Sequence, residues 1–135
     1  MTKEGIRIHL IDHDTATLLY LFEELTRAGF HVNASSASLR ALDCIAETKP
    51  QVLLCNLHMP EIEGLEILEK VRRSSPETSV IFMSSCGDWA VHEEVIQRGA
   101  KDLVPKPLTA KVLLRAVERV LEPTPAGSVH ALRPG

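Results

Sequence analysis

The stretch PQVLLCNLHMPEIEGLEIL, residues 50–68, decides the fold. Its four apolar residues at 52–55 form an unbroken run, which is typical of a strand that is covered on both faces. Asn56 ends this run, and a short loop leads to Gly64, from which apolar residues recur at helical spacing. A fully apolar strand that leads into a helix is the repeating unit of a parallel α/β sheet, and we expect such a sheet here.

The same alternation of short apolar runs and helical periods extends in both directions from this stretch. Further strands are expected at residues 6–11, 30–34, 80–83 and 102–104. The helices expected beside them carry apolar stripes that we assign to the core, namely Leu18, Phe22 and Leu25, then Leu39, Leu42, Ile45 and Ala46, and finally Val112, Leu113, Ala116, Val117 and Val120. Five strands that alternate with five helices predict the α/β class, with a doubly wound parallel sheet covered by helices on both sides.

Length and composition limit the kind of protein further. A chain of 135 residues suits one domain, which we place at residues 1–121, and the Pro- and Gly-rich residues 122–135 predict a flexible tail or linker. The net charge of −3 and the lack of a basic run argue against binding to nucleic acid or to an anionic membrane. Three cysteines without CxxC spacing and the lack of a long apolar stretch predict a reduced, cytoplasmic protein.

Polar residues follow four of the expected strands. Asp12, His13 and Asp14 come after the first strand, and Asp14 is also placed to cap the helix that follows. Asn56 closes the third strand. The fourth strand ends in Ser84-Ser85, and the fifth runs into Lys106-Pro107. Because ligands bind outside the carboxyl ends of the strands in such sheets, these are the candidate functional residues.

In this order and spacing, the residues at the strand ends resemble the receiver domain of bacterial response regulators. The resemblance covers about residues 5–121, and residues 50–68 are similar to the family's third-strand signature over their whole length. It implies a five-stranded sheet of flavodoxin-like topology, with the strand order 2-1-3-4-5. It also implies a signalling module of a two-component or phosphorelay system.

The resemblance assigns a role to each of these residues by position. Asp12 and His13 match the acidic pair that binds a divalent metal, and Asn56 matches the aspartate that accepts the phosphoryl group. Ser84 and Lys106 match the hydroxyl and the lysine that contact the phosphoryl oxygens. In the family, these groups hold and neutralise the charge that develops during phosphoryl transfer.

Three of the matched positions depart from the family pattern. Asn56 carries a carboxamide, which is isosteric with aspartate but cannot form an acyl phosphate. His13 replaces a hard oxygen ligand by an imidazole, which suits zinc or copper better than magnesium. Leu103 stands where the family usually has an aromatic switch residue. We therefore expect a pseudo-receiver that works without phosphorylation, with no catalytic residues, no enzyme activity, no cofactor and magnesium binding that is weak or lost.

Such a module would act through a protein partner, for example a histidine kinase, an output domain or another signalling protein. The resemblance points to the face made by the fourth helix, the fifth strand and the fifth helix, which could also form a homodimer. Trp89, the only tryptophan, opens the fourth helix and is the candidate anchor on that face. Partial packing of Trp89 into the core is the alternative.

Other functions fit the sequence less well. Asn56 could be an engineered replacement of aspartate in a conventional phospho-accepting receiver, which the codon at position 56 would decide. A haloacid-dehalogenase-like phosphatase would use Asp12 and Asp14, but the acidic motif expected after Lys106 is missing. A metal site at Asp12 and His13, or one where His13, His58 and Cys86 converge, lacks ligands at recognised spacing. No Gly-rich turn follows the first strand, which argues against a nucleotide or flavin site.

Overall fold

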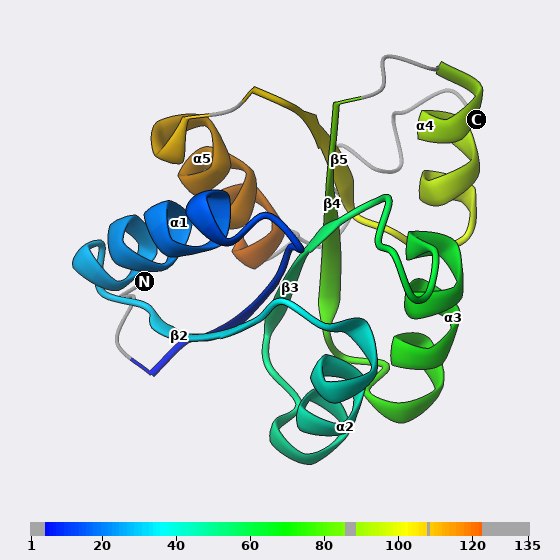
Figure 1. Ribbon diagram of the computed structural model, residues 1–135, viewed down its shortest axis with the longest axis horizontal. Coiled ribbons are helices and arrows are strands. Elements are labelled where there is room, and N and C mark those ends of the chain that lie inside the picture. Colours follow the sequence, from blue (N-terminus) through cyan, green and yellow to red (C-terminus); the bar gives the residue numbers. More distant parts are fainter. Residues whose placement is uncertain (1–4, 86–88, 108, 123–135) are drawn as a thin grey trace.

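The computed structural model describes residues 5–85, 89–107 and 109–122, in which strands and helices alternate strictly along the chain (Figure 1). The elements are β1 (Arg7–Ile11), α1 (Thr15–Arg27), β2 (His31–Ser35), α2 (Ser38–Thr48), β3 (Val52–Asn56), α3 (Gly64–Ser74), β4 (Ser79–Ser84), α4 (Trp89–Gln97), β5 (Asp102–Pro105) and α5 (Ala110–Leu121). All ten expected elements are present, and the ends of the strands differ from the predicted ones by at most one residue. In the described part of the chain, no helix is long and apolar enough to cross a membrane.

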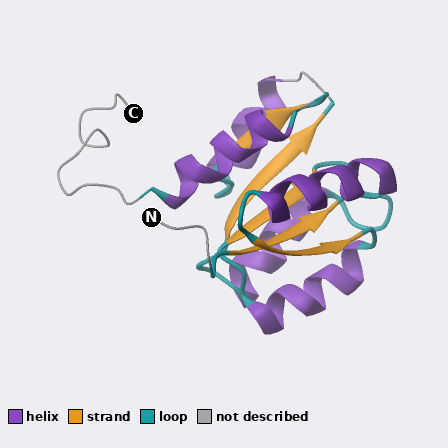
Figure 2. Cartoon of the chain, turned by 90° about the vertical axis from the view of Figure 1, so that its left-hand side faces the viewer, coloured by secondary structure: helices purple, strands orange, loops and turns teal. Residues whose placement is uncertain are grey.

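The five strands form one parallel sheet in the order β2-β1-β3-β4-β5, which confirms the predicted fold class and strand order. Figure 2 shows this twisted sheet between two layers of helices. The register aligns the ends of neighbouring strands, with Ile11 of β1 opposite Cys55 of β3, and Ser84 of β4 opposite Pro105 of β5. The residues that follow these strands therefore lie along one edge of the sheet.

The sheet divides the core into two layers. Helices α1 and α5 cover one face, and α2, α3 and α4 cover the other (Figure 1). In β3, Val52 and Leu54 pack into the first layer, whereas Leu53 and Cys55 pack into the second. The unbroken apolar run of this strand is thus explained, because both of its faces are buried.

Two of the predicted helix stripes are partly wrong. In α2, Leu39 is 56% exposed and Ala46 is also exposed, because the buried face is formed by Ser38, Ala41 and Ile45. In α5, Val112 is 49% exposed, while its neighbour Leu113 is fully buried. Small residues on the buried face of α2 shift that face away from the bulkier apolar residues, which a pattern based on side-chain size does not register.

Candidate functional site

The carboxyl edge of the sheet brings the predicted polar residues together. Asp12 follows β1, Asn56 is the last residue of β3, Ser84 is the last residue of β4, and Lys106 follows β5. The chain direction of a parallel sheet places these positions at the same edge. Of the four, Asp12, Asn56 and Ser84 are buried and Lys106 is partly exposed.

Asp12 is the most fully enclosed charged group of this edge. Its side chain has no exposed surface, and its Oδ2 accepts a hydrogen bond of 2.8 Å from the Lys106 Nζ. The other oxygen, Oδ1, accepts a bond of 3.0 Å from the backbone N–H of Asp14. An ion pair thus joins the segments that follow β1 and β5, and each carboxylate oxygen has a donor.

Asn56 lies between two of the strand-end loops. Its side-chain nitrogen donates a hydrogen bond of 2.9 Å to the backbone carbonyl of His58 and lies 3.3 Å from the His13 Nδ1. Because an amide nitrogen only donates, this contact is a hydrogen bond in the tautomer whose Nδ1 is the acceptor. The same nitrogen lies 3.8 Å from the Asp12 carboxylate, and the His13 side chain is 52% exposed.

The loop after β3 holds the His58 carbonyl in place. The N–H of Leu57 donates to the carbonyl of Met83 at 2.8 Å, and the N–H of Gly64 donates to the carbonyl of Leu57 at 2.8 Å. A Cβ atom at position 64 would lie only 2.6 Å from that Leu57 oxygen. Glycine is therefore required where α3 begins, because the backbones approach too closely for any side chain.

Asp14 caps α1, as the sequence predicts. Its side chain accepts a bond of 2.6 Å from the Thr17 hydroxyl and one of 3.2 Å from the N–H of Ala16. The hydrogen bond from Thr17 is the main cause that lowers the pKa of Asp14, with smaller contributions from backbone N–H groups and from the charge of Lys106. Asp14 thus stays ionised at the mouth of the site, but its contacts are those of a helix cap.

A pocket of about 390 Å³ opens beside Lys106. It is lined by Asp14, Thr17, Tyr20, Ser85, Lys106 and Pro107. The Tyr20 hydroxyl accepts a hydrogen bond of 3.1 Å from the N–H of Ala110, so it ties α1 to the start of α5. The sequence analysis did not identify Thr17 and Tyr20. Asp14, Thr17 and Tyr20 follow one another at intervals of three residues, which places them on one helical face.

The remaining predicted residues lie around this centre or apart from it. Ser84 is buried, and its carbonyl accepts a bond of 2.7 Å from the N–H of Lys106. Leu103 is half-buried against the α2, α3 and α4 side of the core. His58 is exposed, and its Nδ1 lies 3.3 Å from Glu63. Cys86 and the side chain of Trp89 lie outside the described residues.

Metal ligands do not cluster in the described part of the chain. Within residues 5–85, 89–107 and 109–122, no group of three or more His, Cys, Asp and Glu side chains could hold a metal ion. Cys55 is fully buried beside this edge, and burial raises the pKa of its thiol far above the ordinary value. That thiol stays protonated and is a core residue, not a ligand.

Comparison of the sequence and the fold with those of known proteins finds matches over most of the chain. A sequence model of the family described as "Response regulator receiver domain" matches residues 8–118. The chain is 27% identical to the chemotaxis protein CheY of Thermotoga maritima over 117 residues, which cover 86% of this chain and 98% of CheY. It is 28% identical to the response regulator MprA of Mycobacterium bovis, over 96% of this chain but only 57% of MprA.

Solved structures agree with these sequence relatives. The crystal structure of a response regulator receiver domain protein from Clostridium thermocellum superposes with a TM-score of 0.81 at 25% sequence identity. The superposition covers 86% of this chain and 94% of that chain. The likeness thus spans one whole domain, while the chain spans little more than half of a relative such as MprA.

Proposed function

The chain belongs to the response regulator receiver domain family, and we propose that it is a receiver that signals without being phosphorylated. Receiver domains are signalling modules of two-component systems, which interact with histidine kinases and output domains. The proposal adds that this one transmits its signal by protein contacts alone. Its partner would then recognise a surface of one fixed conformation.

The observation that carries this proposal is the side chain at the end of β3. Asn56 is 6% exposed, and its amide group donates to the His58 carbonyl instead of presenting a free nucleophile. A carboxamide has no anionic oxygen to attack phosphorus, and an acyl phosphate needs a carboxylate. The buried carboxylate of the same edge, that of Asp12, already has a donor on each oxygen.

The donors at this edge also fit magnesium poorly. Mg²⁺ prefers an octahedron of hard oxygen ligands, usually with one or two carboxylates. Among the residues that the structure describes, Asp12 is the only buried carboxylate, and it is paired with Lys106. The His58 carbonyl accepts a hydrogen bond from Asn56. The imidazole of His13 is not a hard ligand. We infer that the edge is neutralised within the chain and does not require a divalent metal.

The absence of an aromatic residue at position 103 supports the same proposal. Leu103 is half-buried against the core, and it has no polar group that could form a hydrogen bond if the side chain moved to the surface. A partner would therefore bind a surface that does not change its conformation. We propose that this surface is the face of α4, β5 and α5, through which a homodimer could also form. Trp89 remains the proposed anchor of that face.

The test is direct phosphorylation. The purified wild-type protein is incubated with acetyl phosphate and Mg²⁺, and separately with a histidine kinase and ATP, and intact-protein mass spectrometry follows. We expect no phosphoryl adduct, and no change in amide chemical shifts with beryllofluoride and Mg²⁺. A labile adduct on the peptide that contains Asn56 would overturn the proposal.

Matched variants make this result interpretable. We expect Asn56→Asp alone to be phosphorylated slowly, because His13 still replaces the second acidic ligand. The double variant Asn56→Asp, His13→Asp should be phosphorylated much faster, since it has the carboxylates that magnesium requires. If the double variant is correctly folded and still unreactive, the cause does not lie at these two positions, and the explanation by Asn56 and His13 fails.

A further inference from the structure

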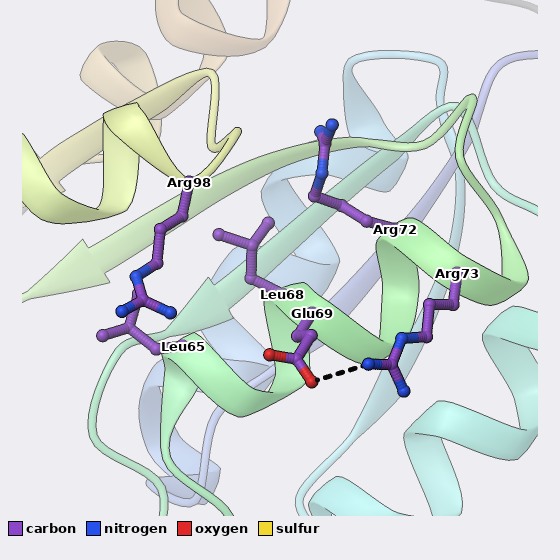
Figure 3. Close-up of a pocket in the computed structure, with 6 residues that line it drawn as sticks. All are labelled: Leu65, Leu68, Glu69, Arg72, Arg73 and Arg98. Carbon is purple, nitrogen blue, oxygen red and sulfur yellow. Dashed lines mark hydrogen bonds and ion pairs between the residues drawn. The ribbon is translucent and has the colours of Figure 1, made fainter.

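A second pocket, which shares no lining residue with the pocket beside Lys106, lies between α3 and the end of α4. Its volume is about 300 Å³, and it is lined by Leu65, Leu68, Glu69, Arg72, Arg73 and Arg98 (Figure 3). Three of the nine arginines of an acidic chain thus surround one small pocket. We propose that this pocket is a docking site for an acidic segment of a protein partner, in which an aliphatic side chain is flanked by carboxylates.

The charge of the pocket is the first argument. Three guanidinium groups and one carboxylate line it, although the whole chain has a net charge of −3. Arg73 pairs with Glu69 at 3.2 Å, and Arg98 pairs with Glu94 at 3.2 Å, but all four side chains are largely exposed. Exposed pairs of this kind contribute little and leave most of the five N–H donors of each arginine available to a ligand.

The second argument concerns Arg72, whose guanidinium forms no ion pair with another described residue. Its guanidinium lies over the backbone of Gly99, where an added Cβ would be 2.4 Å from the Nη1. Gly99 also has a φ of +114°, a conformation that glycine adopts most easily. The backbone between α4 and β5 thus makes room for a cation that lines the pocket and has no counter-charge within residues 5–85, 89–107 and 109–122.

The floor of the pocket is the third argument. Leu65 is half-buried and Leu68 is buried. In Figure 3, Leu68 lies between Arg98 and Arg72, and Leu65 lies beside the end of the Arg98 side chain. An aliphatic side chain would cover these leucines, while a carboxylate on each side would reach an arginine. Favourable placement of cations near helix C-termini accounts for single arginines at these positions. It does not account for their arrangement around an apolar floor.

The occupant is a partner, not the tail of this chain. The tail of residues 122–135 has a single acidic residue, Glu122, together with one arginine, Arg133, so it lacks the two carboxylates that would flank an aliphatic side chain. The pocket shares no lining residue with the pocket beside Lys106, so this inference does not rest on the proposed function. Either can fail while the other holds.

The test uses a defined acidic probe and the full chain. The capped peptide Ac-EELEE-NH2 is titrated into ¹⁵N-labelled protein at physiological ionic strength, and amide chemical shifts are followed. We expect saturable shifts concentrated in residues 65–73 and 98–100. The double variant Arg72→Ala, Arg98→Ala should bind at least tenfold more weakly, whereas Arg115→Ala, an exposed arginine on α5, should bind like the wild type.

Probe variants separate this proposal from simple charge attraction. Ac-EEAEE-NH2 should bind about fivefold more weakly, because it lacks the side chain that covers the leucines. Ac-KKLKK-NH2 should not bind. Equal binding of the leucine and alanine peptides, equal loss in Arg115→Ala, or no saturable shift would overturn the proposal. So would self-association of the wild type, measured by light scattering, that the double variant abolishes, because a second copy would then occupy the pocket.

Discussion

Two buried polar side chains on one short segment, His9 in β1 and Asp12 just after it, have opposite electrostatic states. Asp12 has no exposed surface and is paired with the cation of Lys106. His9 is 1% exposed, its Nε2 lies 3.0 Å from the Ser35 hydroxyl, and no described group bonds its Nδ1. Burial without a counter-charge lowers the pKa of His9 to about 4.

The contrast shows what the carboxyl edge supplies and the middle of the strand does not. At His9, the neighbours in the register are Asn33 of β2 and Leu53 of β3, and neither offers a charge. Asp12, three residues later, lies beyond the end of β1, and there Lys106 from the segment after β5 provides a positive charge. A buried charge is stable only where such a partner arrives, and elsewhere the group stays neutral.

The largest effect is expected when the lysine charge is removed. Lys106→Met keeps most of the side-chain length but leaves the Asp12 carboxylate buried without a counter-charge. We expect the free energy of unfolding at pH 7 to fall by about 4 kcal/mol, as for other buried pairs that lose one partner. Urea unfolding followed by circular dichroism measures this change.

The double variant Asp12→Asn, Lys106→Met is the control for this prediction. It removes both charges, so most of the lost stability should return. If the double variant is as unstable as Lys106→Met, the loss comes from packing around the lysine stem, and the electrostatic contrast with His9 does not hold.

Acid is expected to have the next largest effect, through His9. Its pKa is 6.5 in the unfolded chain and about 4 in the folded one, so below pH 6.5 only the unfolded chain takes up the proton. Stability is thus full above pH 6.5 and falls as the pH drops towards 4, by about 3 kcal/mol in all. Unfolding free energies of the wild type and of His9→Leu at several pH values measure this contribution.

The two profiles should differ in slope. Between pH 6.5 and 4, His9→Leu should lose less stability than the wild type, because leucine takes up no proton. Carboxylates elsewhere affect both proteins alike and cancel in the difference. Parallel profiles would mean that His9 becomes protonated in the folded protein without cost.

Sequence reasoning reached the strand-end residues because chain direction alone brings them together. The apolar run at 52–55 predicted a central strand, and Asp12, Asn56 and Lys106 followed from the strand ends. The prediction that Leu39 lies on the buried face of α2 was wrong. That face is formed partly by Ser38 and Ala41, which are neither large nor strongly apolar. The bond from Asn56 to the His58 carbonyl depends on how a loop folds back, which no local pattern encodes.

The pocket of arginines was also beyond the sequence. Arg72 and Arg98 belong to different segments, each with ordinary spacing for an exposed helix end. Only the packing of α3 beside the end of α4 makes them neighbours, and only the conformation of Gly99 explains why one of them lies so close to the backbone. Such sites arise from tertiary placement, so they are found in a structure and not in a motif.

A smaller effect is expected when a second carboxylate enters the edge. Asn56→Asp places a negative charge near Asp12 with the same single lysine and removes the donor to the His58 carbonyl. We expect the unfolding free energy to fall by about 2 kcal/mol at pH 7. Repulsion and burial raise the pKa of the new carboxyl, so the deficit relative to wild type should shrink as the pH falls.

The matched control is Asn33→Asp on the exposed face of β2, which should change stability by no more than about 0.5 kcal/mol. An Asn56→Asp protein as stable as the wild type would mean that Lys106 can neutralise two carboxylates, and the edge would then be less fully balanced than its contacts indicate.

The smallest effect is expected at His9, the neutral one of the two buried side chains compared above. Ser35→Ala removes the hydroxyl 3.0 Å from the His9 Nε2 and leaves that ring with no described partner on either nitrogen. A lost neutral hydrogen bond lowers the unfolding free energy by about 1 kcal/mol, and Ser36→Ala, at an exposed neighbour, should leave it unchanged. The loss of stability from Ser35→Ala should be several times smaller than that from Lys106→Met. The first variant removes a neutral hydrogen bond, whereas the second leaves a buried charge without a counter-charge. Equal losses would show that Asp12 is not held by its counter-charge, which would remove the physical basis for an edge that is neutralised within the chain.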